Sequence, residues 1–169
     1  MDINLFPLDR VEFNGIAIPL GADNVIVEAV IGPGETFGTR RYYYHNELAI
    51  DYDANNKVEF IEFLGGVDGT LKPVIYGVSA FDTDAEELAR LLQKHNGGTF
   101  ADEEHGHAYQ FRNISVGVYR ELTPADVAEM IEEMKADGIP AENDPDLEAD
   151  KRRAEHWSAI GMGVAGYYQ

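Results

Sequence analysis

Apolar and polar residues alternate with a period of two along much of the chain, which predicts antiparallel strands. Residues 11–13 and 16–18 flank Asn14 and Gly15, and an Asn-Gly pair between apolar residues is a strong hairpin signal. Residues 40–66, RRYYYHNELAIDYDANNKVEFIEFLGG, predict a three-stranded antiparallel meander, and residues 72–80 predict a further strand.

Two segments change to helical spacing. Asp23 caps a short predicted helix that ends at Gly32, and its β-branched residues mean that tertiary packing must stabilise it. Thr83 and Glu86 form a capping-box pattern that predicts the start of a second helix, which ends at Gly97. The apolar stripe of this second helix consists of Ala85, Leu88, Ala89 and Leu92.

A third predicted helix has the clearest pattern. Thr123 caps it, Pro124 lies in its first turn, and Gly138 follows its end. Its apolar stripe at i, i+3, i+4 and i+7 consists of Val127, Met130, Ile131 and Met134. We expect this stripe to pack into the domain core, and the alternative is a groove for a partner. A short fourth helix is expected from Asp144 through Ala154.

The two halves of the chain resemble each other. Residues 41–46 align with residues 108–113, where a second hairpin is expected, and the third strand of each half would be residues 58–64 and 157–164. This similarity indicates two degenerate α-β-β-β units, and the alternative is a coincidence between two similar hairpins. The prediction is therefore an α+β fold, with helices packed on one face of an antiparallel sheet.

A single domain over residues 1–169 is expected, because 169 residues suffice for one sizeable core. Within it the repeated halves would be residues 11–80 and 81–169. Residues 121–156, which contain the third and fourth predicted helices, would be an acidic helical insertion before the last strand.

Residues 20–61 resemble the short repeat of β-lactamase-inhibitor-like and outer-membrane lipoprotein BamE-like proteins. In that repeat a small helix precedes an aromatic strand and a hairpin of the form fD-x-(D/N)-(G/N)-K-V. The matching positions are Leu20, Gly21, Val25, Gly32, Tyr42, Tyr44, Ile50, Tyr52, Asp53, Asn56, Lys57, Val58 and Ile61. The resemblance implies an architecture that is used for protein–protein binding, including inhibitor and toxin-immunity roles.

Composition and charge narrow the function. The chain has no cysteine, which excludes disulfides and thiolate chemistry, and it shows no signal peptide, so a cytoplasmic location is expected. The net charge of −18 disfavours nucleic acid and anionic membrane as partners and favours a basic protein. No nucleophile elbow, Ser-His-Asp arrangement or phosphate-binding loop is present, so we expect a non-catalytic protein without a cofactor.

The negative charge is concentrated in one segment. Residues 121–150 contain eleven acidic residues and one basic residue, Lys135, which gives a local charge of −10. Such a block is typical of a solvated face or an interaction segment. The residues predicted to bind a basic partner are Glu129, Glu132, Glu133, Asp137, Asp144 and Asp146.

Two groups of residues have the spacing of metal ligands. Asp51, Asp53, Asn55 and Glu62 match the oxygen ligands of a calcium loop. Their flanks alternate with strand period, so we interpret them as a hairpin turn. The His105-x-His107 pair lies beside three acidic residues and resembles a zinc or nickel site without a third histidine. We therefore expect no metal site.

The sequence favours an acidic cytosolic protein that covers a basic partner, of the inhibitor or toxin-immunity type. The alternative is a metal- or small-ligand-binding domain, or an enzyme, with a pocket between the two halves. Gly161, Gly163 and Gly166 have the spacing of a dinucleotide fingerprint, but no helix follows them. These glycines are instead expected to permit close contacts of the last strand.

Overall fold

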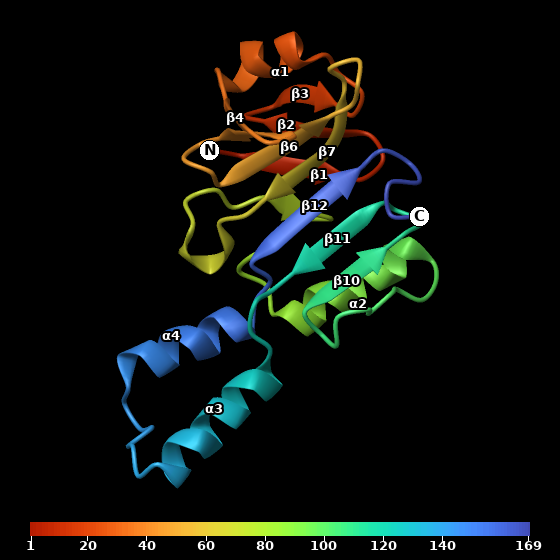
Figure 1. Cartoon of the computed structure of the whole chain (residues 1–169). Helices are drawn as coiled ribbons and strands as arrows, with labels where there is room; N and C mark the ends of the chain where they lie inside the picture. The colour runs from red at the N-terminus through yellow and green to blue at the C-terminus, as the bar shows by residue number, and fades with distance from the viewer.

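A computed structural model describes all 169 residues and confirms an α+β fold. Two sheets and the helices α1 (Asn24–Ile31) and α2 (Ala85–Asn96) form the body of the molecule. The helices α3 (Pro124–Ala136) and α4 (Pro145–Ala154) project from one end of this body as a helical hairpin, as Figure 1 shows. We call residues 124–154 the hairpin.

The larger sheet has seven strands in the order β10-β11-β12-β7-β6-β5-β4, and every neighbouring pair is antiparallel. Its strands are β4 (Glu35–Phe37), β5 (Arg40–Tyr43), β6 (Leu48–Tyr52), β7 (Val58–Phe63), β10 (Ala108–Phe111), β11 (Val116–Tyr119) and β12 (Ala159–Gly163). The meander predicted over residues 40–66 is confirmed as β5, β6 and β7.

The smaller sheet has the order β3-β2-β1-β8-β9. Its strands are β1 (Ile3–Phe6), β2 (Arg10–Phe13), β3 (Ile16–Pro19), β8 (Val74–Ile75) and β9 (Val78–Ser79). The predicted Asn-Gly hairpin is confirmed, since Asn14 and Gly15 have φ values of 50° and 80° between β2 and β3. Such positive φ values at both positions are typical of a type I′ turn.

The single strand predicted over residues 72–80 is wrong. The chain reverses at Tyr76 and Gly77, which have φ values of 49° and 82°, so the segment forms the short β8–β9 hairpin. Gly77 is the one turn residue at this reversal, and tyrosine is unusual at the left-handed position before it. The cap of the second helix is also off by one residue, because the Asp84 carboxylate, not Thr83, accepts the amides of Glu86 and Glu87.

One apolar core lies between the two sheets and beneath α2. It contains 28 buried residues from both sheets, from α1 and α2 and from connecting segments, and its largest side chains include Phe63, Phe81, Phe111 and Trp157. On β12 the side chains of Ile160 and Met162 belong to this core, so Gly161 and Gly163 lie on the opposite face of the seven-stranded sheet. We call that opposite face the outer face.

The hairpin has its own small apolar cluster. Val127, Leu147 and Ala154 are buried there, and Ile131 and Met134 pack against them half-buried. The prediction that the α3 stripe packs into the domain core is therefore wrong, because the stripe faces α4 and not a sheet. This cluster is small, and it joins α3 to α4 rather than to the body. The attachment of the hairpin to the body must therefore come from other contacts.

Each predicted half ends at the centre of the larger sheet. Strands β5-β6-β7 and β10-β11-β12 lie on either side of the β7–β12 pairing, and α1 and α2 precede them in the chain. This order would bring two repeated units together through their third strands, although the repeat itself stays a prediction.

No helix of the chain combines the length and the apolar character needed to cross a membrane.

Candidate functional site

The acidic residues predicted to bind a partner lie on the hairpin. Glu129, Glu132 and Glu133 are exposed on α3, and Asp137 is exposed just after it. Asp146 is exposed in the first turn of α4, where the helix dipole favours a carboxylate. These five side chains are accessible to a partner.

Asp144 has a different role from the other five acidic residues. It is half-buried and is the N-cap of α4, where its carboxylate accepts the amides of Asp146 at 2.9 Å and Leu147 at 3.2 Å. Removing an N-cap carboxylate typically costs about 1 kcal/mol of stability. Asp144 therefore stabilises the start of α4 and lies on the same hairpin as the five exposed acids.

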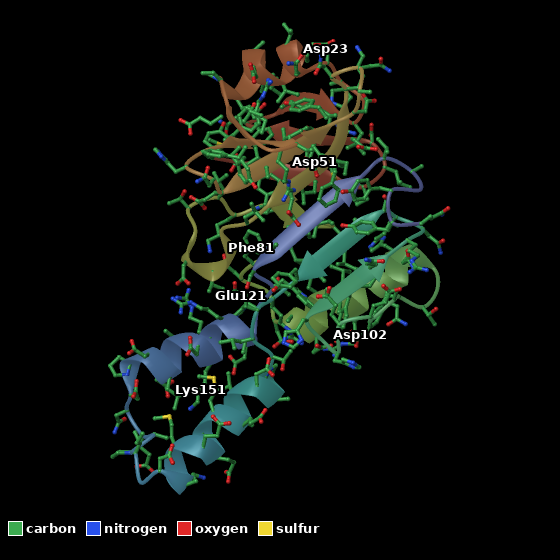
Figure 2. All side chains as sticks on the ribbon, viewed as in Figure 1. Asp23, Asp51, Phe81, Asp102, Glu121 and Lys151 are labelled. Carbon is green, nitrogen blue, oxygen red and sulfur yellow. The ribbon has the colours of Figure 1, made fainter.

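Few cations lie beside the hairpin acids. Three short-range pairs occur: Glu132 with Lys135, Glu148 with Lys151, and Asp150 with Arg153. Exposed pairs of this kind contribute little and leave the surrounding field negative. α3 ends and α4 begins away from the body, so Glu132, Glu133, Asp137, Asp144 and Asp146 lie toward the tip of the hairpin. Figure 2 shows Glu121 where the hairpin meets the body and Lys151 on α4.

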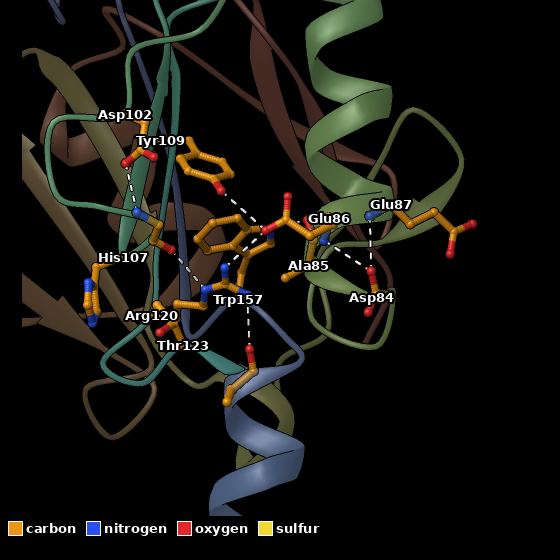
Figure 3. A network of polar contacts seen from close by, with 12 residues as sticks. Asp84, Ala85, Glu86, Glu87, Asp102, His107, Tyr109, Arg120, Thr123 and Trp157 are labelled. Atoms are coloured by element: carbon orange, nitrogen blue, oxygen red, sulfur yellow. Dashed lines mark hydrogen bonds and ion pairs between the residues drawn. The ribbon is translucent and has the colours of Figure 1, made fainter. Parts of the chain in front are cut away.

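Arg120 attaches the base of the hairpin to the body. Its side chain is only 4% exposed, and its guanidinium donates Nε–H to the Gly106 carbonyl at 2.9 Å. Nη1 donates to the Ala154 carbonyl at the end of α4 at 2.9 Å, and Nη2 donates to Glu86 Oε1 on α2 at 3.0 Å. One planar cation thus joins three segments, which the forked geometry of arginine permits (Figure 3).

Trp157 lies directly beneath this guanidinium. The indole is fully buried, and the Arg120 guanidinium carbon lies 4.6 Å from the ring centroid. Its Nε1–H donates to the Ala85 carbonyl at 2.8 Å, and its ring meets Tyr109 edge-on at 4.9 Å. We call Glu86, Tyr109, Arg120 and Trp157 the anchor.

Further contacts fix the orientation of the hairpin at its base. The Ala85 amide donates to the Glu155 carbonyl at 2.8 Å, and Arg153 forms an ion pair with Asp68 at 2.9 Å. The hairpin is therefore held by polar contacts at the C-terminal end of α4, which add to its small apolar cluster.

His107 supports the start of α3. Its Nε2 lies 2.8 Å from Asp126 Oδ2, and its Nδ1 lies 2.8 Å from the Glu104 carbonyl oxygen. Asp126 also accepts the Thr123 amide at 2.9 Å, which completes the capping box of α3. Hydrogen bonds to Glu104 and then to Asp126 raise the pKa of His107, and those from Thr123 and then His107 lower the pKa of Asp126.

These shifts predict a pH-dependent contribution of the His107–Asp126 pair. A raised His107 pKa stabilises the fold below about pH 6.5, and this contribution is lost as pH rises through the folded-state value. The lowered Asp126 pKa contributes above about pH 4 and is lost as pH falls through its folded-state value. Urea denaturation should therefore show a larger loss for His107→Gln at pH 5.5 than at pH 8. In an Asp126→Asn background that difference should shrink, and an equal loss at both pH values would contradict the assignment.

The residues with the spacing of metal ligands, for which no metal site was expected, take part in structural contacts. His107 binds Asp126, and His105 lies in a turn with a φ of 50°. Asp51 and Glu62 both pair with Arg40, and Asp53 accepts the amides of Asn55 and Lys57 in the turn before β7. No group of three or more histidine or acidic side chains is arranged to hold a metal ion.

Sequence patterns alone missed the anchor. Arg120 is an isolated cation whose acceptors come from residues 86, 106 and 154, so only the folded chain brings them together. Trp157, as the only tryptophan, offers the one signal that could have pointed to this place. A single large aromatic residue beside an insertion is most simply a packing anchor.

Comparison with protein-family models, curated proteins and solved structures finds no significant match to this chain. The resemblance of residues 20–61 to inhibitor-like and BamE-like repeats therefore stays a prediction. Function has to be argued from the site itself.

Proposed function

We propose that this protein is a non-catalytic binding protein, of the inhibitor or toxin-immunity type, whose hairpin covers a basic surface of a partner protein. The observation that supports the proposal is a projecting helical hairpin that carries exposed, largely unpaired acids and is anchored at its base. Accessible charge favours steering of a partner, and a fixed base limits the ordering entropy that binding costs.

The charge distribution supports a protein partner of positive charge. The hairpin acids lie on a narrow projection, so their negative electrostatic potentials add there. An approaching partner would meet this potential before it contacts the body. Electrostatic complementarity of this type mainly raises the association rate and fixes orientation.

Neutralising the hairpin acids should slow association. The variant Glu129→Gln, Glu132→Gln, Glu133→Gln, Asp137→Asn is expected to lower the association rate about tenfold at low salt, because it removes the steering field. The dependence of the rate on salt should also become flatter. Pull-down from the native host at low and high salt supplies the partner, and stopped-flow or surface binding measures the rate.

A matched control keeps the net charge change equal. The variant Asp2→Asn, Glu35→Gln, Glu87→Gln, Glu104→Gln neutralises four exposed acids of the body. It should retain most of the wild-type association rate. Equal slowing by both variants would mean that net charge alone matters, and an unchanged rate in the hairpin variant would remove the hairpin from the binding surface.

A further inference from the structure

A cleft of about 500 Å³ opens on the outer face of the seven-stranded sheet. Strands β5, β6 and β7 and the residues after β12 form its walls, and its main side chains are Arg40, Asp51, Glu59, Phe60, Glu62 and Tyr167. The hairpin leaves the sheet where Tyr119 faces Ala159, at the start of β12. The cleft lies nearer the other end of that strand, because its residues Glu62 and Phe60 pair with Gly161 and Gly163. The cleft is therefore a second surface, separate from the hairpin.

Glycines let aromatic rings lie flat on the sheet beside this cleft. A Cβ atom at Gly161 would lie 2.2 Å from Cζ of Phe60, and one at Gly163 would lie 2.6 Å from Cβ of Tyr167. The rings of Phe60 and Tyr167 stack in parallel, with centroids 4.4 Å apart and an angle of 5° between their planes. The glycine spacing noted in the sequence thus permits an aromatic wall.

The cleft has an excess of negative charge. Arg40 is its only cation, and it donates Nε–H to Asp51 Oδ1 at 3.0 Å and pairs through Nη1 with Glu62 Oε1 at 2.9 Å. The second oxygens of these carboxylates accept no hydrogen bond from the protein, and Glu59 forms no ion pair. Three carboxylates and one guanidinium leave the cleft with an excess of two negative charges.

The negative charge of the cleft also acts on the hydroxyl of Tyr167. Burial raises the pKa of the Tyr167 hydroxyl, and the charges of Asp51, Glu59 and Glu62 raise it further, against the opposing effect of Arg40. The carboxylates therefore act on the ring that forms the wall. A flat aromatic surface beside free carboxylate oxygens suits a cation, through cation–π contact and charge-assisted hydrogen bonds.

We propose that this cleft binds an arginine or lysine side chain presented by the basic partner protein. The proposal rests on the proposed function for the source of the cation and names a second contact for the same partner. An anionic ligand would meet the excess carboxylates, and a neutral side chain would leave their free oxygens desolvated and unpaired. Arg40 holds Asp51 and Glu62 in place, so the acceptor oxygens are preorganised.

The test is an NMR titration with the capped peptide acetyl-Gly-Arg-Gly-amide. Backbone resonances of Phe60, Glu62 and Tyr167 should shift in a saturable way. The neutral peptide acetyl-Gly-Gln-Gly-amide should leave them unchanged. The double variant Glu59→Gln, Glu62→Gln should weaken binding about fivefold or more, since it removes the excess charge. If that variant unfolds, Tyr167→Leu, which removes the stacked ring, should also weaken binding.

Three results would overturn the proposal: no shift at the cleft, equal shifts with the neutral peptide, or saturable binding of spermidine without binding of the arginine peptide. The last result would identify a free polyamine as the ligand class. The titration needs no partner protein, so it separates the two proposals. Cleft binding by the peptide together with an unchanged association rate of the hairpin variant would reject the hairpin and retain the cleft, and the reverse pair of results would reject only the cleft.

Discussion

Replacing Trp157 by alanine is expected to lower the free energy of unfolding by about 3–5 kcal/mol. The indole is fully buried between α2 and β10, so its removal leaves a cavity that the surrounding strands cannot close. It also leaves the Ala85 carbonyl without its indole donor and Arg120 without the ring beneath its guanidinium. Urea denaturation followed by circular dichroism measures the loss.

Trp157→Phe is the matched control. It keeps an aromatic ring beneath Arg120 but loses the hydrogen bond to Ala85 and part of the volume, so a smaller loss of about 1–3 kcal/mol is expected. A loss below about 1 kcal/mol for the alanine variant would mean that the cavity collapses, and the anchor would then not depend on the indole.

Replacing Arg120 by methionine should destabilise the protein by about 2–4 kcal/mol. The methionine side chain fills similar space but cannot donate to the Gly106 and Ala154 carbonyls, so two acceptors near the base of the hairpin lose a charged donor. Glu86 is half exposed and can be hydrated, which limits the loss. Urea denaturation gives the total change in unfolding free energy.

Hydrogen exchange should locate the effect of Arg120→Met in the hairpin. Amides of α3 and α4 should lose more protection than those of β7 and β12, because the hairpin opens when its attachment weakens. Arg112→Met is the matched control, since Arg112 is exposed and pairs only with Glu103 on the surface, and it should change stability by less than about 0.5 kcal/mol. Uniform loss of protection across the chain would show that Arg120 stabilises the whole body rather than the hairpin.

Local patterns predicted most helices and hairpins. Thr123 and Asp144 mark the starts of α3 and α4, and Gly97 ends α2 with a φ of 71°, because capping depends on residues within one turn. The acidic block of residues 121–150 also predicted an exposed segment correctly. Such features depend on neighbouring residues, so they can be predicted without knowledge of the rest of the fold.

Features that depend on distant partners could not be predicted in this way. Tyr44 and Tyr76 adopt left-handed conformations that tyrosine rarely takes, and in each case a ring contact accompanies the turn. The ring of Tyr44 stacks with that of Phe13 in the smaller sheet, with centroids 6.3 Å apart. The ring of Tyr76 stacks on that of His95 in α2, with centroids 3.6 Å apart. The stacking partners lie in other elements, so the turn at Tyr76 is visible only in the folded chain.

Of the two candidate sites, the hairpin acids could be predicted from local sequence and the cleft could not. The hairpin acids were found because like charges cluster in sequence. The cleft was missed because its carboxylates and aromatic rings come from β6, β7 and the residues after β12. Asp51 and Glu62 were noticed for their calcium-like spacing, and cross-strand pairing with Arg40 is what determines their role.

The position of β12 has a consequence for synthesis on the ribosome. β12 pairs with β11 on one side and with β7 on the other, yet it is the last of the twelve strands to be translated. Until it emerges, β11 and β7 each present an unpaired strand edge, which invites pairing with another nascent chain. The larger sheet therefore stays open until β12 is available, and conditions that delay its emergence from the ribosome should favour aggregation over folding.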